Sequence, residues 1–175
     1  LDHVALLGDT LEAIAEQKAG IIKQGIPLVT GHIVPEALTV IDSIAEAKNA
    51  PRLTYGKDYQ VSHQKSVVTG EIFDYTSSVR QGSFQTGLLG LHQIENAGMA
   101  IALLDTFCQE DRRELASNDL VAQALKETRW PGRLEVVSSD PLMILDGAHN
   151  PHAIKALLAT LQERFADYRK EILFT

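Results

Sequence analysis

Residues 1–23 read LDHVALLGDTLEAIAEQKAGIIK, and this stretch decides how the rest of the chain is interpreted. Asp9 or Thr10 is typical of a helix N-cap. Lys18 lies seven residues after Leu11, which puts it in the middle of the apolar face of the predicted helix at about 100° per residue. A lysine that points inward is costly unless it is paired, neutralised or chemically modified. A lysine that extends out along its own stem, or meets a buried acid, fits the spacing equally well. The apolar face comprises Leu11, Ile14, Ala15 and Ile22.

The pattern DHxxxLGxTxxxIAxxKAGIIK resembles the central-domain signature of folylpolyglutamate synthases and dihydrofolate synthases, in the Mur ligase superfamily. The resemblance implies that carbon dioxide carbamylates Lys18, converting a cation into an anion that serves catalysis and a metal site. It also implies that His3 is a ligand of magnesium, with water and phosphate filling the rest of the shell. Without the surrounding motif, His3 fits a hydrogen-bonded core histidine equally well.

The composition is that of an ordinary globular protein of 175 residues. Lys and Arg total 16 against 23 Asp and Glu, for a net charge of −7. An acidic chain without a basic run is a poor partner for nucleic acid or an anionic membrane. The single cysteine, Cys108, excludes an internal disulfide and fits a reducing compartment, so we expect a cytoplasmic protein. We also expect the full-length protein to be a monomer.

The sequence contains no G-x-x-x-x-G-K-[ST] phosphate loop. The families it resembles carry that loop upstream of the matching position. We therefore expect an internal fragment: residues 1–132 form the later part of a central ATPase domain, and residues 133–175 begin a C-terminal glutamate-ligase domain.

The expected fold class is α/β. A short apolar run at 26–32 predicts a buried parallel strand, and residues 35–48 predict a helix that begins at a proline. Segments 59–63, 70–77 and 82–86 predict antiparallel strands added to the edge of the parallel sheet. The resemblance implies a central domain of the phosphate-loop type and a Rossmann-like C-terminal domain.

Residues 91–109 predict a strong helix whose N-terminal end carries His92 and Asn96 on one face. On spacing alone, these residues fit a polar pair that caps loop carbonyls as well as a binding site. The segment LLGLHQIENAGMA resembles the family pattern GxHQxxNAxxA, which implies that Asn96 contacts adenine and His92 assists nucleotide binding. An amide suits adenine because it offers a donor beside an acceptor. The predicted buried side comprises Ala97, Ala100, Leu104 and Phe107.

Residues 117–129 predict another helix, with Leu120, Ala124 and Leu125 inward, which stops at the break WPGR. Arg133 fits a solvated cation in a linker. The resemblance instead makes WPGR the hinge between the two domains and directs Arg133 to the nucleotide phosphates, where its fork can serve two oxygens.

Two short strands at 134–138 and 142–145 lead into DGAHNP, and a helix follows to about residue 165. Asn150 is expected to be the N-cap of that helix, with Pro151 at its first position. Asp146 and His149 follow the end of a strand, where open α/β sheets place ligands. DGAHNP resembles the D-x-AHNP signature of Mur-type ligases, which implies that Asp146, His149 and, secondarily, Asn150 close over the nucleotide.

The implied reaction is ATP-dependent amide formation with Mg²⁺, in which L-glutamate is joined to dihydropteroate or to the γ-carboxylate of folate through an acyl phosphate. Such chemistry depends on dispersing charge on phosphate oxygens, so we expect no Ser/His/Asp triad. Two alternatives remain: another Mur-superfamily ligase, acting on peptidoglycan precursors or cyanophycin, and a nucleotide-binding module without turnover.

Overall fold

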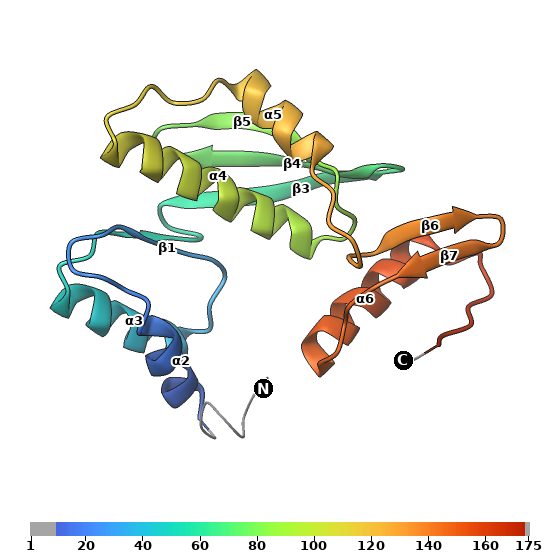
Figure 1. The fold of residues 1–175 in the computed structure, drawn as a ribbon, viewed down its shortest axis with the longest axis horizontal. Helices are drawn as coiled ribbons and strands as arrows, with labels where there is room; N and C mark the ends of the chain where they lie inside the picture. The colour runs from blue at the N-terminus through green and yellow to red at the C-terminus, as the bar shows by residue number, and fades with distance from the viewer. Residues whose placement is uncertain (1–9, 174–175) are drawn as a thin grey trace.

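A computed structural model describes residues 10–173, which form three neighbouring groups of elements (Figure 1). A small parallel sheet with two helices is followed by an antiparallel sheet with two helices, and a hairpin with one helix ends the chain. None of the helices in residues 10–173 is both long and apolar enough to cross a membrane. The elements are α2 Leu11–Ala19, β1 Leu28–Thr30, α3 Pro35–Ala47, β2 Arg52–Thr54, β3 Tyr59–Val67, β4 Gly70–Ser77, β5 Gln81–Thr86, α4 His92–Glu110, α5 Asn118–Glu127, β6 Glu135–Ser139, β7 Leu142–Leu145 and α6 Pro151–Arg164.

The first group confirms the predicted strand–helix–strand order. β1 and β2 pair in parallel, with Val29 opposite Leu53. The hydroxyl of Thr10 accepts a hydrogen bond from the Ala13 N–H at 3.2 Å, so Thr10 is the N-cap of α2. α2 packs against α3. The small core between them is made of Ala19, Ile22, Ala45 and Ala50.

The inward orientation predicted for Lys18 is wrong. Lys18 is exposed, as is Leu11, although Ile14 and Ala15 beside them are buried. Among residues 10–173, α2 packs chiefly against α3, and these residues cover only a narrow stripe of its surface. A lysine at the border of such a stripe keeps its ammonium group in water without cost.

The predicted antiparallel strands form, but they make a sheet of their own in the order β3-β4-β5, not an extension of the parallel sheet. The chain turns sharply after β2, where the Asp58 carboxylate accepts the Thr54 N–H at 2.7 Å and Gly56 adopts a φ of +80°. This turn leads β3 away from the edge of β2. The Tyr59 hydroxyl still connects the two sheets, because it donates to the Thr30 carbonyl at 2.9 Å, and burial raises its pKa far above the ordinary value.

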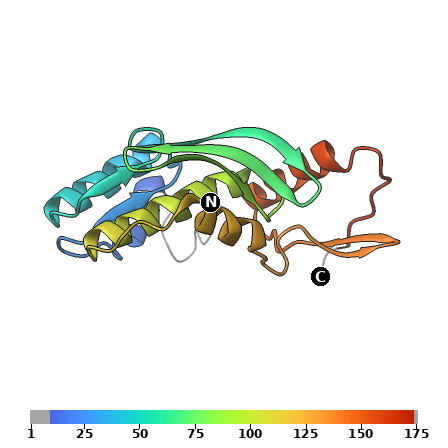
Figure 2. The same cartoon turned by 90° about the horizontal axis from the view of Figure 1, so that it is seen from above.

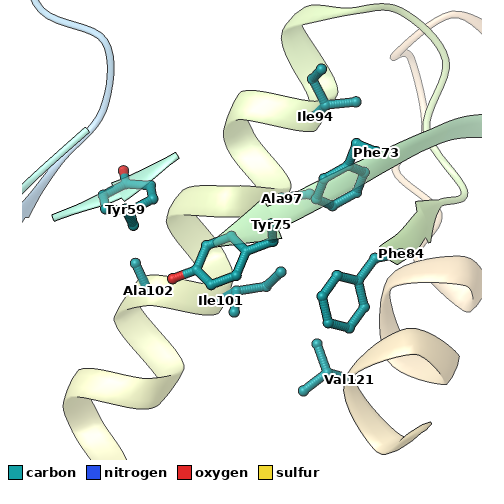
Figure 3. Close-up of a cluster of buried hydrophobic side chains, with 9 residues drawn as sticks. All are labelled: Tyr59, Phe73, Tyr75, Phe84, Ile94, Ala97, Ile101, Ala102 and Val121. Carbon is teal, nitrogen blue, oxygen red and sulfur yellow. The ribbon is translucent and has the colours of Figure 1, made fainter. Parts of the chain in front are cut away.

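Helix α4 lies across one face of the antiparallel sheet and supplies one wall of the main core (Figures 1 and 3). Figure 2 shows the same layering from above. Gly98 permits the close approach, because a Cβ atom there would lie 2.4 Å from Val61 Cγ1 of β3. The core cluster consists of Tyr59, Phe73, Tyr75, Phe84, Ile94, Ala97, Ile101, Ala102 and Val121.

The buried side predicted for α4 is largely wrong. Ala97 is buried as expected, but Ala100, Leu104 and Phe107 are exposed. The sheet packs instead on the neighbouring stripe that Gly98 opens. That stripe includes a charged residue, which a hydrophobic pattern cannot assign to a core. The residues of α4 that are buried beside Ala97 are Gln93, Ile94, Gly98, Ile101, Ala102, Asp105 and Cys108.

The last two helices begin where the sequence predicts. Ser117 caps α5 through the Leu120 N–H, and Asn150 caps α6 through the Ala153 N–H. The inward side predicted for α5 is wrong in part: Leu125 packs against the core as expected, but Leu120 and Ala124 are exposed and Val121 is the buried residue. β6 and β7 form the predicted strand pair, joined as an antiparallel hairpin.

A buried ion pair between Arg80 and Asp105 joins the antiparallel sheet to α4 and α5. Both side chains are at most 4% exposed, and the Arg80 Nη2 lies 2.6 Å from the Asp105 Oδ1. The guanidinium also donates to the Asn118 side chain and to the Ala116 carbonyl, both beside the start of α5. The hydrogen bonds to Asp105 raise the pKa of Arg80, so the guanidinium stays charged.

We expect Arg80→Met to destabilise the protein by about 3–5 kcal/mol, because it leaves the carboxylate of Asp105 buried without its partner. The control is Arg52→Met, which breaks the partly exposed pair between Arg52 and Asp42. That change should cost less than about 1 kcal/mol. Urea unfolding followed by circular dichroism measures both, and equal costs for the two variants would contradict the prediction.

Candidate functional site

Four of the residues singled out in the sequence meet in one cleft, although they come from two distant segments of the chain. His92 and Asn96 lie on the first turns of α4, and Arg133 and Asp146 lie at the two ends of the β6–β7 hairpin. The cleft has a volume of about 230 Å³. Its full lining is His92, Gln93, Asn96, Arg133, Leu134, Asp146, Ala153, Ala156 and Leu157.

On the α4 side, Gln93 organises the polar groups. Its side chain is buried, and its Oε1 accepts a hydrogen bond from the Asn96 Nδ2 at 3.1 Å. Its Nε2 lies 3.1 Å from the His92 Nε2. Gln93 therefore orients both predicted nucleotide contacts, while Asn96 itself is exposed. Sequence reasoning missed Gln93, although it stands inside the HQxxNA segment that singled out its neighbours.

The turn before β6 presents Arg133 to the cleft. The turn is held by the Gly132 N–H, which donates to the Glu135 carboxylate at 2.8 Å. Arg133 is exposed, and it also lines a second hollow of about 350 Å³. That hollow lies between the β3–β4 turn and the segment 129–136, and it includes the exposed Trp130. A cation between two hollows is suited to an extended anion such as a triphosphate.

Asp146 ties the DGAHNP loop to this turn. Its Oδ2 accepts the Leu134 N–H at 2.9 Å, and its Oδ1 accepts the Ala148 N–H at 2.8 Å. The Gly147 N–H adds a third connection by donating to the Gly132 carbonyl at 2.8 Å. Leu134 is buried with a φ of +46°, an uncommon conformation for leucine, so this carboxylate supports the local backbone. Asp146 thus has a structural task whatever it contributes to a ligand.

His149 and Asn150 stand outside the lining of the cleft. His149 is exposed, and its Nδ1 lies 2.8 Å from the Gly147 carbonyl oxygen. Asn150 performs the capping predicted for it, since its Oδ1 accepts the Ala153 N–H at 2.9 Å. The ligand-binding contributions expected of these two residues stay predictions.

The predicted metal site cannot be built from the described residues. Within residues 10–173, no group of three or more His, Cys, Asp or Glu side chains is placed to hold a metal ion. Lys18 is not among the residues that line the cleft, and His3 lies outside the described part of the chain. The residues present therefore do not form a magnesium shell by themselves.

Comparison with known proteins shows which families and structures this chain is similar to. Residues 132–175 match the family described as Mur ligase, glutamate ligase domain. The chain is 37% identical over 175 residues to the dihydrofolate synthase/folylpolyglutamate synthase of Bacillus subtilis, covering 99% of this chain and 40% of that protein. It is 36% identical over 167 residues to the folylpolyglutamate synthase of Lacticaseibacillus casei, covering 95% of this chain and 39% of that protein.

Solved structures agree with the sequence comparison. The apo form of the L. casei folylpolyglutamate synthase matches with a TM-score of 0.88 at 35% identity, over 98% of this chain and 41% of that one. A folylpolyglutamate synthase in complex with AMPPCP and folate matches with a TM-score of 0.87 at 35% identity, over 93% of this chain and 40% of that one.

The C-terminal segment therefore has the sequence of a Mur ligase glutamate-ligase domain. The resemblance indicated by the motifs is confirmed over nearly the whole chain, which is a relative of the folylpolyglutamate and dihydrofolate synthases. The chain spans about 40% of the length of these relatives.

We expect Asp146→Ala to destabilise the protein by about 1–3 kcal/mol, because it leaves two backbone N–H groups without their acceptor. The matched control is His149→Ala, a change at an exposed side chain that should cost within about 0.5 kcal/mol. Thermal and urea unfolding of both variants measure the difference. An Asp146→Ala protein as stable as the parent would show that the two hydrogen bonds carry no net stability.

Proposed function

We propose that this chain is part of an ATP-dependent ligase that adds L-glutamate to dihydropteroate, to the γ-carboxylate of folates, or to both. Support comes from the names of the relatives and from the structural neighbour that holds AMPPCP and folate. The division into a central ATPase domain up to residue 132 and a C-terminal domain from 133 is part of the same proposal.

The observation that carries the proposal is the cleft between α4 and the C-terminal segment. The amide of Asn96 on one wall and the guanidinium of Arg133 on the other wall line the same cleft. In the proposed arrangement Asn96 binds the adenine edge, oriented by Gln93, and Arg133 binds phosphate oxygens. In the same proposal the DGAHNP loop, which follows the carboxyl end of β7, contributes Asp146 to the cleft.

The proposed chemistry has two steps. A carboxylate oxygen of the pterin substrate attacks the γ-phosphorus of ATP, and the bond between that phosphorus and the β,γ-bridging oxygen breaks. ADP is released, and the substrate carboxylate becomes an acyl phosphate. The glutamate amine then attacks the acyl carbon, a proton is lost from nitrogen, and inorganic phosphate leaves as the amide forms. Negative charge gathers on phosphate oxygens in the first step, and this is the charge that Arg133 stabilises.

A magnesium ion, when bound, would neutralise the phosphate oxygens and polarise the γ-phosphorus. The described residues do not supply its ligands, so no step is assigned to it here. Carbamylated Lys18 and His3 remain the proposed contributors from the beginning of the chain. The exposed amine of Lys18 is open to carbon dioxide and carries the modification in this proposal.

The full-length protein tests the proposal directly. Purified protein is supplied with ATP, magnesium and labelled L-glutamate, together with dihydropteroate, tetrahydrofolate or a UDP-muramyl peptide precursor. Incorporation of glutamate into either pterin substrate is the expected result. Activity on the UDP-muramyl substrate alone would move the protein to another branch of the superfamily, and binding of ATP without any turnover would make it a nucleotide-binding module.

We expect Arg133→Gln to lower kcat/KM for ATP by about 10²-fold, the scale of losing one donor to a charge that develops in the transition state. The control is Arg129→Gln, four residues away, whose guanidinium donates to the Lys126 and Thr128 carbonyls. Steady-state kinetics with varied ATP separates the two. Equal losses in both variants would mean that the charge of the segment matters and Arg133 has no individual contact.

We expect Lys18→Ala to abolish ligation and a short carboxylate such as acetate or formate to restore part of it, by replacing the carbamate anion. Lys23→Ala is the matched control, because Lys23 is also exposed and lies five residues further along. It should keep parental activity with and without the additive. Full activity of Lys18→Ala without any additive would exclude the carbamate.

A further inference from the structure

The carboxylate of Glu71 lies at a junction of three segments that are far apart in sequence. Glu71 belongs to β4 and is only 1% exposed. Its Oε1 accepts the Gly90 N–H at 2.8 Å and a hydrogen bond from the Arg164 Nη1 at 2.7 Å. Its Oε2 accepts the Ser66 hydroxyl at 2.6 Å. One carboxylate oxygen of Glu71 therefore accepts hydrogen bonds both from the segment just before α4 and from the last residue of α6.

The Arg164 guanidinium fastens the end of α6 to the β3–β4 turn. Arg164 is the last residue of α6, and its side chain is 10% exposed. It donates to the Val67 carbonyl through Nη2 and to the Gly70 carbonyl at 3.2 Å through Nη1. Because these acceptors surround the guanidinium, the contact fixes the direction of approach as well as the charge pairing.

α6 passes directly beside the start of α4 at this junction. Gly90 has a φ of +104°, and a Cβ atom there would lie 2.9 Å from both the Thr160 Oγ1 and the His92 ring. Thr160 is buried on α6, one turn from the cleft residues Ala156 and Leu157. The two helices that form opposite walls of the cleft are therefore held together just behind it.

The ion pair between Glu71 and Arg164 and the hydrogen bonds around it are expected to form or break together. Glu71 is buried, so removing Arg164 leaves a carboxylate that is stabilised only in part by the Ser66 and Gly90 hydrogen bonds and by His63, whose Nε2 lies 3.4 Å from the Glu71 Oε2. Neither residue belongs to the hydrophobic cluster between the antiparallel sheet and α4, although Glu71 is buried in β4 beside it.

We propose that Glu71 and Arg164 are positioning residues that hold α6 against the start of α4 and so set the width of the cleft. Neither side chain lines the cleft, and both act through the helices they join. The consequence for ATP rests on the function proposed above, whereas the consequence for the distance between the helices does not.

Spin-label distances in the full-length protein test the proposal. Labels are attached at Gln109→Cys on α4 and Lys155→Cys on α6, both exposed positions, in a background that includes Cys108→Ala and lacks other reactive cysteines. The variants are Arg164→Gln, Glu71→Gln and the two together. The matched control is Arg169→Gln, because Arg169 pairs with Glu171 in the exposed segment after α6.

We expect a single narrow distance distribution in the parent and in Arg169→Gln, and a broader distribution shifted to longer distances in Arg164→Gln. In the same variant KM for ATP should rise about tenfold with a smaller change in kcat, which corresponds to about 1.4 kcal/mol of binding free energy. Arg164→Lys should restore only part of the effect, because an ammonium group does not reproduce the fork.

A folded Arg164→Gln protein with the parental distance distribution would overturn the proposal. If Arg164→Gln does not fold, the neutral pair Glu71→Gln with Arg164→Gln carries the same measurement, since it leaves no buried charge unpaired, and an unchanged distribution there overturns the proposal equally. A changed distance with unchanged ATP kinetics would support the positioning of the helices and count against the function assigned to the cleft.

Discussion

The ion pair between Arg80 and Asp105 is the interaction on which the arrangement of the central part depends. It fixes the C-terminal half of α4 to the antiparallel sheet, and through Asn118 and Ala116 it also fixes the start of α5. Because α4 is a rigid rod, holding one half of it determines where the other half lies. The positions of Gln93 and Asn96, and therefore one wall of the cleft, follow from a contact several turns away.

α4 is thus anchored by buried charge at two places. Asp105 meets Arg80 toward its C-terminal end, and the Gly90 N–H just before its first turn meets Glu71. Between these anchors the helix packs with apolar residues and with Gly98, which lets the sheet approach closely. Apolar packing sets the distance between layers without fixing direction, whereas the charged contacts have defined geometry. Their combination gives the cleft a specified shape.

Local sequence signals predicted the elements well, and the physical reason is that those signals act over a few residues. Thr10 and Asn150 cap helices as expected, because capping involves a side chain and an N–H three positions on, and Ser117 caps α5 in the same way. The alternating segments likewise became β3, β4 and β5. The predictions of which sides of α2, α4 and α5 are buried were wrong in part, because the buried side of a helix depends on which elements pack against it. On α4, Gly98 lets the sheet pack on a different side from the one predicted.

For the candidate site, the residues in recognisable motifs were found, and those that position them were missed. His92, Asn96, Arg133 and Asp146 do gather in one cleft. Gln93 had a signal inside its motif, but Glu71, Arg80 and Arg164 had none, since a single charged residue in a strand or at a helix end is usually solvated. Their partners lie 93 and 25 residues away, a separation that no local pattern spans.

In the DGAHNP loop, residues of a functional motif also have structural roles. Both oxygens of Asp146 are occupied by backbone N–H groups, and Asn150 caps α6. These bonds stiffen the loop between the end of β7 and the start of α6.

A histidine held in such a loop has less conformational freedom to lose when a ligand arrives, so binding costs less entropy. His149 is the residue that stands in this position, exposed on a backbone that its neighbours have already ordered. The structural tasks of Asp146 and Asn150 therefore serve any ligand contact that His149 makes, because they supply the rigidity on which that contact depends.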